Sequence, residues 1–374
     1  MIGISSPDST IQTTTSRAAG GFLWWYLDLV DAAGDGLVLI WSQNLPFLPD
    51  VSYGLRRGER PIPADHPSLN VVVHQGGKPA FYALQQHDPS DWSWDPEAQA
   101  WRIGRSRLQL EDHGDGRMTL TGSLDCAIPA SAHRLTGTVR VEGHRRQPGD
   151  TVDRRSSHLW CPLMTATTGQ ASLAWGGDRA ELRGRAYLDR NESTTPLNEL
   201  GIDRWWWGRL PLPGRELIWY RLDPKGDGPR RDIVLEVRED GSSRLAAAPD
   251  IALSGGGWGR YGLAFPQRVA FTDPDGARIV TNVAHVVEDG PFYQRFVVHA
   301  QVDGRRATGV SELVCPDRIA LPGLRPLIDM RVHQVDGPNS MWLPLFTGGR
   351  RGRVGRLLGQ GRRTPALPDT ARSR

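Results

Sequence analysis

The sequence is poor in the features that mark several common classes of protein. Its 374 residues include three cysteines, Cys126, Cys161 and Cys315, which lie far apart and form no Cys-x-x-Cys or Cys/His cluster. We therefore expect neither a zinc site nor a disulfide framework, and a reducing, cytoplasmic setting fits. No run approaches the roughly 18 apolar residues of a membrane-spanning helix, and the Ser/Thr-rich start has no apolar run, so no signal peptide is expected.

Motifs for several catalytic and cofactor-binding classes are also missing. There is no Gly-x-Ser-x-Gly, no P-loop and no His-Glu-x-x-His. The glycine run in 254–257 does not lead from a strand into a helix, as dinucleotide binding requires. A net charge of +3 indicates no nucleic-acid partner. We expect no metal and no cofactor.

Glycine (43 residues) and proline (28) are abundant, and both disfavour helices. Short alternating apolar runs separated by Gly, Pro, Asp and Asn predict an all-β chain of barrels or sandwiches. Segment 25–28 reads Trp-Tyr-Leu-Asp and precedes Gly-Asp-Gly at 34–36 and an apolar strand. A similar order recurs at 219–223 and 226–228, which predicts two related β domains in tandem.

Four segments follow from this organisation. Residues 1–20 are predicted to be a flexible lead-in, 21–209 and 210–346 the two β domains, and 347–374 a disordered tail. The tail is rich in arginine, with eight Arg and one Asp from Gly348 onward, and contact with anionic lipid or nucleic acid is the alternative. The preceding stretch 321–332 is a candidate interfacial element.

The strongest candidates for chemistry are two pairs of residues with the same spacing. Tyr187 and Asp189 lie two apart, as do His158 and Trp160. Residues two apart on a strand face the same side, so each pair would face one space. If the two strands are neighbours, all four side chains converge. The structural alternative is an ordinary aromatic core with a surface Asp.

A carboxyl buried among aromatic rings has a raised pKa and stays protonated, which suits acid catalysis on an alkene. Protonation of a trisubstituted double bond gives a tertiary cation, which indole and phenol faces stabilise without capturing it. Asp189 would be the acid. His158 would either hold Asp189 in its rotamer or deprotonate the incoming water.

Further aromatic residues are candidates for binding an apolar substrate, because 14 tryptophans suit a large apolar cavity. Trp205 and Trp207 share one face if they lie on a strand, and Trp25 and Tyr26 are the other candidates, with barrel core as the alternative for all of them. Residues 190 and 191, Arg and Asn, are predicted to form the turn after the Asp189 strand.

At these residues the sequence resembles the carotenoid 1,2-hydratase (hydroxyneurosporene synthase) family. The resemblance rests on 20–28, His158-Leu159-Trp160, 187–192, 205–209 and 309–312. It implies two lipocalin-like β-barrel domains and cofactor-free addition of water to the terminal 1,2 double bond of an acyclic carotenoid. It also implies that Asp189 is the proton donor, supported by His158, Trp160 and Tyr187. The lipocalin-like superfamily also contains Diels–Alderases.

Three functions remain open from the sequence. The first is a hydratase, a carbon–oxygen lyase that acts on a carotenoid or another isoprenoid. The second is a pericyclase or cyclase that orders a polyene without proton transfer. The third is a non-catalytic carrier of an apolar ligand. A polyene substrate is dissolved in membrane lipid, so we expect a transient contact of the protein with a membrane surface. The sequence does not indicate an oligomeric state.

Overall fold

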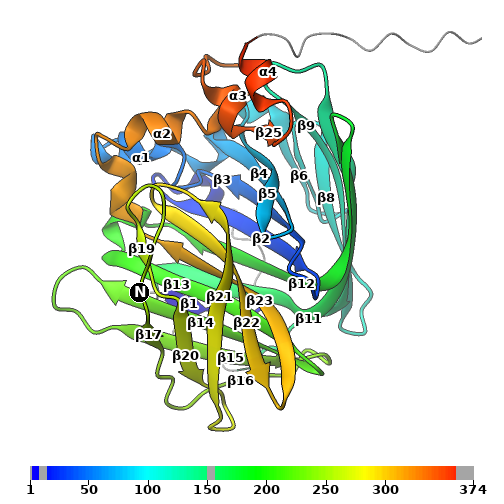
Figure 1. The fold of residues 1–374 in the computed structure, drawn as a ribbon, viewed down its shortest axis with the longest axis vertical. Coiled ribbons are helices and arrows are strands. Elements are labelled where there is room, and N and C mark those ends of the chain that lie inside the picture. Colours follow the sequence, from blue (N-terminus) through cyan, green and yellow to red (C-terminus); the bar gives the residue numbers. More distant parts are fainter. Residues whose placement is uncertain (1, 8–14, 150–155, 359–374) are drawn as a thin grey trace, which may run out of the picture.

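The computed structural model describes residues 2–7, 15–149 and 156–358, and here the chain forms two curled, mainly antiparallel sheets (Figure 1). This confirms the prediction of an all-β chain with two lipocalin-like β units. The helices within the described ranges are short and lie at chain connections rather than over a sheet face. They are α1 (Pro49–Arg56), α2 (Arg325–Asp329), α3 (Leu343–Phe346) and α4 (Arg353–Leu357).

The first sheet contains fourteen strands among the described residues. Its order is β24-β5-β4-β3-β2-β12-β11-β10-β9-β8-β7-β6, with β1 paired to β11 and β25 to β5. The strands are β1 (Ile2–Ile4), β2 (Phe22–Val30), β3 (Gly36–Gln43), β4 (Pro67–Gln75), β5 (Lys78–Gln86), β6 (Trp92–Asp95), β7 (Ala100–Ile103), β8 (Ser106–Asp112), β9 (Arg117–Ala127), β10 (Arg134–His144), β11 (His158–Trp175), β12 (Asp178–Ser193), β24 (Val332–Gln334) and β25 (Gly348–Gly349).

The second sheet has nine strands in the described part, in the order β16-β15-β14-β13-β23-β22-β21-β20-β17, and a separate two-stranded sheet pairs β18 with β19. These strands are β13 (Ile202–Leu212), β14 (Arg215–Pro224), β15 (Arg231–Arg238), β16 (Ser243–Leu245), β17 (Ala252–Ser254), β18 (Gly257–Trp258), β19 (Ala264–Phe265), β20 (Arg268–Thr272), β21 (Arg278–Asp289), β22 (Tyr293–Val302) and β23 (Arg305–Val314).

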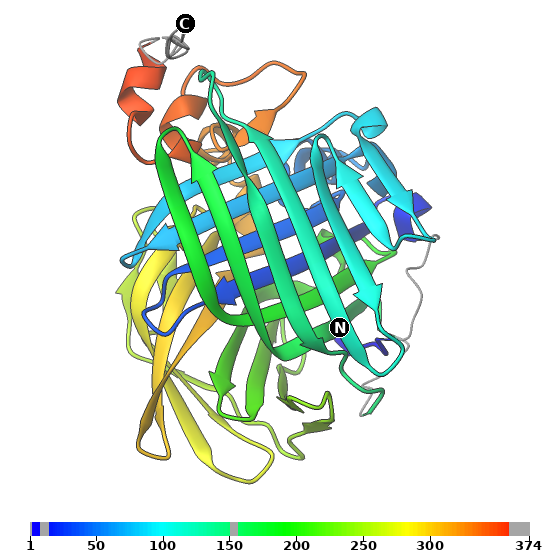
Figure 2. The same ribbon diagram turned by 90° about the vertical axis from the view of Figure 1, so that its right-hand side faces the viewer.

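The first sheet folds over on itself, so that β8–β12 cross in front of β2–β5 in Figure 2. The long strands β11 and β12 take part in both halves. Residues 168–175 of β11 pair with β10, whereas its first residues, 158–160, pair with β1. Two register shifts between Pro162 and Thr167 lie where these halves meet, and Ala166 there has a positive φ of 54°. Such irregularities bend a strand, and this bend directs the start of β11 toward the second sheet.

Buried apolar side chains form three layers. One fills the inside of the folded first sheet, one lies between the two sheets, and one lies behind the second sheet. Strand β2 is buried on both faces, which explains why its sequence is apolar apart from Asp28. Its alternate residues go to different layers, because Trp25 belongs to the first layer and Tyr26 to the layer between the sheets.

The repeated sequence pattern corresponds to two similar hairpins. Strands β2 and β3 form one in the first sheet, and β14 and β15 form the other in the second. Gly34 and Gly226, in their turns, both have a positive φ, of 90° and 72°. Glycine adopts this conformation without the steric cost that a Cβ would add.

The sheets divide the chain differently from the predicted segments. Strand β13 lies wholly in the second sheet, so the change of sheet precedes residue 202 rather than following residue 209. After the second sheet, β24 and β25 return to pair with β5 of the first. Pairing between strands so distant in sequence cannot be predicted from a local sequence pattern.

The two ends of the described chain are also more ordered than predicted. Ile2 and Ile4 are fully buried, and the short strand β1 pairs with β11 in parallel. From the expected tail, residues 348–349 form β25 and 353–357 form α4. The remainder of that tail, 359–374, lies outside the described residues.

Candidate active site

Strands β11 and β12 lie side by side and carry the predicted catalytic residues. Their antiparallel register places Trp160 opposite Asn191. Because alternate residues of a strand share a face, His158 and Trp160 lie on the same side as Tyr187 and Asp189. The structure brings these four side chains together in the layer between the two sheets, each at most 3% exposed.

The carboxyl group of Asp189 is surrounded by hydrogen-bond donors. The indole Nε1 of Trp160 and the hydroxyl of Tyr187 each donate to Asp189 Oδ2, both at 2.8 Å. The side-chain Nδ2 of Asn191 donates to Oδ1 at 2.9 Å. Both oxygens are thus oriented by short contacts from the same two strands, which fixes the rotamer of the acid.

Burial raises the pKa of Asp189 to about 8, because desolvation penalises the carboxylate. The hydrogen bonds from Tyr187 and Trp160 favour the carboxylate and partly oppose this, while the nearby carboxyl group of Glu312 adds to the rise. Burial also holds the pKa of Tyr187 well above its usual value, so its hydroxyl remains protonated. At neutral pH the site therefore contains a neutral carboxylic acid.

His158 contacts this acid through Asn191 rather than directly. Its Nε2 lies 3.0 Å from Asn191 Oδ1, and its ring packs edge-on against Phe22 and Trp24. Burial lowers the pKa of His158 to about 4, so the imidazole is neutral at pH 7. The prediction of a turn at residues 190–191 is wrong, because both lie within β12. The strand continues since it pairs with β2 through residue 193.

An aromatic wall faces the acid from both sheets. The Tyr187 ring lies 5.2 Å from Trp207 and 6.2 Å from Tyr26, measured between centroids, and Tyr26 lies 5.3 Å from Trp207. On the other side, Trp160 lies 5.3 Å from Tyr220 of β14. Most of these contacts are edge-on or tilted. Phenol and indole groups thus surround Tyr187 and Trp160, the two donors to Asp189.

The other two predicted binding residues lie apart from this wall. Trp205 faces the same layer but packs against Phe47, with ring centroids 6.1 Å apart. Trp25 points to the opposite face of β2, against Trp101 at 4.7 Å and beneath the guanidinium of Arg190. Trp25 therefore belongs to the core of the first sheet and not to the site.

A buried ion network joins the two sheets beside Tyr187. Arg209 of β13 donates from Nε to Asp28 Oδ1 of β2 at 2.7 Å, and from Nη1 to Glu216 Oε1 at 2.6 Å. All three side chains are fully buried. Its guanidinium also lies 5.8 Å from the Tyr187 ring. This network fixes the separation of the sheets behind the acid.

A cavity of about 70 Å³ lies in the same layer. A cross-strand row connects it to the acid, because Asp189 pairs with Tyr26, Tyr26 with Ile40, and Ile40 with Asn70. Directly opposed residues share a face of the sheet. Ile40 and Asn70 line the cavity, whereas Asp189 and Tyr26 do not. Tyr26 thus stands between the cavity and the acid.

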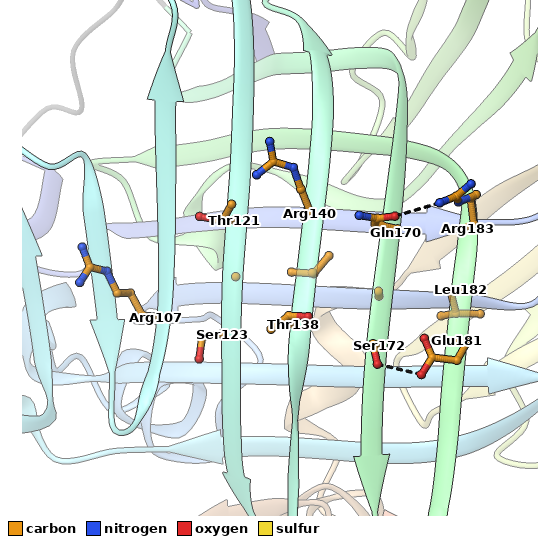
Figure 3. Close-up of a pocket in the computed structure, with 13 residues that line it drawn as sticks. Arg107, Thr121, Ser123, Thr138, Arg140, Gln170, Ser172, Glu181, Leu182 and Arg183 are labelled. Atoms are coloured by element: carbon orange, nitrogen blue, oxygen red, sulfur yellow. Dashed lines mark hydrogen bonds between the residues drawn. The ribbon is translucent and has the colours of Figure 1, made fainter.

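The larger hollows of the surface lie elsewhere. One of about 710 Å³ covers the outer face of β8–β12 and is lined mainly by polar side chains (Figure 3). The pairs Gln170–Arg183 and Ser172–Glu181 are hydrogen-bonded there. This face lies on a different part of the sheet from the buried acid, and its exposed polar lining does not suit an apolar ligand.

In the described ranges no three His, Cys, Asp or Glu side chains are placed to hold a metal ion. The three cysteines are free and buried. No helix of the described chain is long and apolar enough to cross a membrane.

Two residues of the cluster were not among the sequence candidates. Asn191 has the same two-residue spacing from Asp189 that singled out Tyr187, so this signal was present. Tyr220 occupies the position in the second repeat that Tyr26 occupies in the first. The sequence repeat therefore also pointed to Tyr220, although only the fold shows that Tyr26 and Tyr220 face the same layer.

The chain is similar to known proteins in sequence and in fold. The model of the carotenoid hydratase CrtC family matches residues 51–339. An acyclic carotenoid 1,2-hydratase of Thiocapsa roseopersicina is 27% identical over 336 residues, covering 85% of this chain and 74% of that protein. Two crystal structures share the fold. A candidate AttH protein of Nitrosomonas europaea has a TM-score of 0.55 and 14% identity, covering 83% of this chain and 98% of its own. CghA in complex with Sch210972 has a TM-score of 0.53 and 13% identity, and the match covers 83% of this chain and 96% of the CghA chain.

The family model spans most of the chain and includes the β11–β12 cluster. The resemblance inferred from the sequence motifs is thereby confirmed. This chain belongs to the carotenoid hydratase CrtC family of enzymes.

Proposed function

We propose that this protein adds water to the terminal C=C bond of an acyclic carotenoid or related isoprenoid, with Asp189 as the acid. The observation that carries the proposal is a carboxyl group whose pKa is raised to about 8 by burial, set among aromatic rings. Family membership and the hydratase relative support the reaction class.

The first step transfers a proton from the neutral carboxyl group of Asp189 to the CH carbon of a terminal isopropylidene group. The π electrons form the new C–H bond, and the positive charge remains on the tertiary carbon. Trp207 offers a ring face to this cation, and such a contact contributes about 2 kcal/mol when desolvated. Rings stabilise the cation without forming a bond to it.

The donors around Asp189 favour this step. Proton loss leaves a carboxylate, and Trp160, Tyr187 and Asn191 already point N–H or O–H groups at its oxygens. These hydrogen bonds strengthen as charge develops, so they stabilise the transition state more than the ground state. Burial keeps Asp189 protonated before the reaction. During the reaction, the three hydrogen-bond donors stabilise the negative charge of the carboxylate.

In the second step water adds to the tertiary cation and loses a proton. The carboxylate of Asp189 takes that proton back, so one turnover consumes one alkene and one water and restores the acid. The balance requires no oxidant, reductant or cofactor. Neutral His158 holds Asn191 and thereby orients Asp189, which favours the positioning role over direct deprotonation of water.

The substrate chain would lie across the strands, along the row from Asp189 through Tyr26 and Ile40 to the cavity. Adjacent strands are about 4.8 Å apart, so the four strands from β12 to β4 span about 14 Å. Tyr26 must turn aside to admit the reacting end. Its hydroxyl has no hydrogen-bond partner among the described residues, so no such bond opposes the movement.

The reaction class is tested with an acyclic carotenoid in oxygen-18 water. We expect the product to gain one labelled oxygen atom. A cyclised product without solvent oxygen would indicate a cyclase or pericyclase, and recovery of unchanged bound carotenoid would indicate a carrier. Either result would contradict the proposal.

The role of Asp189 is tested with Asp189→Asn, which nearly keeps the shape of the side chain and removes the acidic proton. We expect turnover to fall by at least about a thousandfold, because an isolated alkene needs a strong proton donor. The folded state is checked by circular dichroism. Near-normal turnover in the folded variant would exclude Asp189 as the acid.

We also propose that the C-terminal end of the described chain docks on anionic membranes, from which an apolar substrate would enter. Among the described residues, five of the seven most exposed large apolar side chains lie within residues 321–358, at the end that carries α2, α3 and α4 (Figure 1). They are Leu321, Met341, Trp342, Val354 and Leu358. Arg350 and Arg351 are exposed beside them, and this combination suits an anionic bilayer.

The test is co-sedimentation with phosphatidylglycerol and phosphatidylcholine vesicles. We expect binding to the anionic vesicles, reduced by salt and by replacing Met341, Trp342, Val354 and Leu358 with Ser. Val280→Ser is the control, because Val280 is also an exposed apolar side chain but lies on β21 of the second sheet. Equal loss of binding in the control, or no preference for anionic lipid, would contradict the docking surface.

A further inference from the structure

The cavity between the sheets contains a buried guanidinium group that the hydration mechanism does not use. Arg295 of β22 is fully buried and lines this cavity. Its Nε donates to Glu312 Oε1 at 2.9 Å and its Nη1 to Glu288 Oε2 at 2.6 Å. The third nitrogen, Nη2, has no hydrogen-bond partner among the described residues. Leaving a buried N–H of a charged group without a hydrogen bond costs free energy. We therefore expect a hydrogen-bond acceptor at this position.

A second arginine lines the same cavity. Arg331 donates from Nη2 to the hydroxyl of Tyr261 at 2.9 Å and to the carbonyl oxygen of Asp289 at 3.1 Å. Its Nε, which is also buried, lacks a partner in the described part of the chain. Two fixed guanidinium groups therefore each leave one N–H unsatisfied beside one small cavity. An oxygen atom of a ligand would satisfy such donors.

The charges around the cavity favour a neutral acceptor. The two guanidinium groups are faced by the carboxyl groups of Glu288 and Glu312, which bond to Arg295. The phenols of Tyr82 and Tyr293 also line the cavity. With two positive and up to two negative charges already present, an added carboxylate or phosphate has little net attraction. A hydroxyl or carbonyl oxygen gains the hydrogen bonds without adding charge.

The position of the cavity sets the distance between this oxygen and the reacting bond. Three residues of the cross-strand row line the cavity, Ile40, Asn70 and Leu84, and they lie two, three and four strand spacings from Asp189. At about 4.8 Å per spacing these distances are about 10, 14 and 19 Å.

We infer that this cavity is a subsite for the hydroxyl or carbonyl oxygen of an isoprenoid whose reacting double bond lies about 10–19 Å away, at Asp189. Arg295 and Arg331 donate to the oxygen, and the apolar chain lies along the row between the cavity and the acid. The identity of the reacting end rests on the proposed function. The subsite distinguishes an oxygen-bearing isoprenoid from a pure hydrocarbon of the same length.

Binding is measured in the Asp189→Asn protein, so that no hydration changes the probes. The probes are geranylgeraniol, the hydrocarbon that lacks only its hydroxyl group, and geranylgeranoic acid. Quenching of tryptophan fluorescence gives each dissociation constant. We expect the alcohol to bind about tenfold or more tightly than the hydrocarbon, the gain typical of a hydrogen bond from a charged donor. The acid should bind less tightly than the alcohol.

The variants are Arg331→Met and Arg295→Lys, each of which removes one of the unsatisfied N–H groups. Each should bring the ratio of the two dissociation constants closer to one. Arg260→Met is the matched control, because Arg260 is a largely exposed arginine paired with Asp289 outside the cavity and its replacement should leave the ratio unchanged. If Arg295→Lys does not fold, Arg331→Met alone still tests the subsite, since Arg331 is only partly buried.

Equal affinity for alcohol and hydrocarbon would overturn the subsite, as would an undiminished preference in the folded arginine variants. Tighter binding of the acid would overturn the assignment to a neutral oxygen. A preference for the alcohol that depends on the arginines, in a wild-type protein that adds no water, would overturn the proposed hydration and leave the subsite standing.

Discussion

Replacing the proposed acid should make the protein more stable while it destroys activity. In the unfolded chain an Asp carboxyl titrates near pH 3.9, whereas burial raises the pKa of Asp189 to about 8 in the folded state. Between these values folding takes up a proton. The stability contributed by the neutral carboxyl is therefore complete below about pH 4 and is lost progressively as the pH rises toward 8.

The size of the effect follows from the two pKa values. Each pH unit above the unfolded pKa lowers the free energy of unfolding by about 1.4 kcal/mol, so about three units, at pH 7, give an upper limit of about 4 kcal/mol. Asn avoids this loss because it does not titrate. It has only one acceptor oxygen for the donors of Trp160, Tyr187 and Asn191, and losing one hydrogen bond costs about 1 kcal/mol. We expect Asp189→Asn to be up to about 3 kcal/mol more stable at pH 7.

The assay is urea unfolding, followed by tryptophan fluorescence from about pH 4 to pH 7. The advantage of Asp189→Asn should be small at pH 4 and grow as the pH rises. Asp203→Asn is the control, because Asp203 is a half-exposed carboxyl, and such a surface change should alter stability by no more than about 0.5 kcal/mol. An Asp189→Asn protein that is no more stable than wild type at pH 7 would refute a neutral buried acid.

Three further changes test the supporting residues. Asn191→Leu removes the link from His158 to Asp189, and turnover should fall about tenfold with loss of one charge-stabilising hydrogen bond; unchanged turnover would contradict a positioning role. Trp207→Leu should lower kcat about ten- to thirtyfold through loss of cation stabilisation, whereas Trp25→Leu, on the other face of β2, should alter stability but not kcat; equal kcat losses would contradict the assignment of faces. Arg209→Met leaves two carboxyl groups buried and unpaired, and chemical denaturation should show a loss of about 3–5 kcal/mol; a loss below about 1 kcal/mol would exclude a structural role.

The sequence was most informative where strand alternation alone determines position. The two-residue spacing of Tyr187 and Asp189, repeated in His158 and Trp160, placed each pair on one face of a strand. The same rule shows that Trp25 and Tyr26, which are adjacent, cannot both face the acid. Which of them does was not predictable, because both faces of β2 are buried and both select apolar residues.

Features that depend on pairing between distant strands were not readable. The proximity of Arg295 to Glu312 and the return of β24 to β5 follow from strand order, which no local pattern encodes. The buried strand at Ile2–Ile4 was missed because three residues give too short an alternation to recognise. The division between sheets near residue 202 was misplaced because the Trp run of β13 is buried on both faces, and such a run fits either sheet.

The central claim is that neutral Asp189 transfers the proton, and the pH dependence of turnover tests it most directly. Rates are measured with a detergent-solubilised acyclic carotenoid from about pH 5 to pH 10. Because the protonated acid is the active form, the rate should be constant below about pH 7 and fall about tenfold per unit above a pKa of about 8. A rate that already falls with rising pH between about pH 5 and pH 7, as for an ordinary exposed carboxyl, would contradict the account.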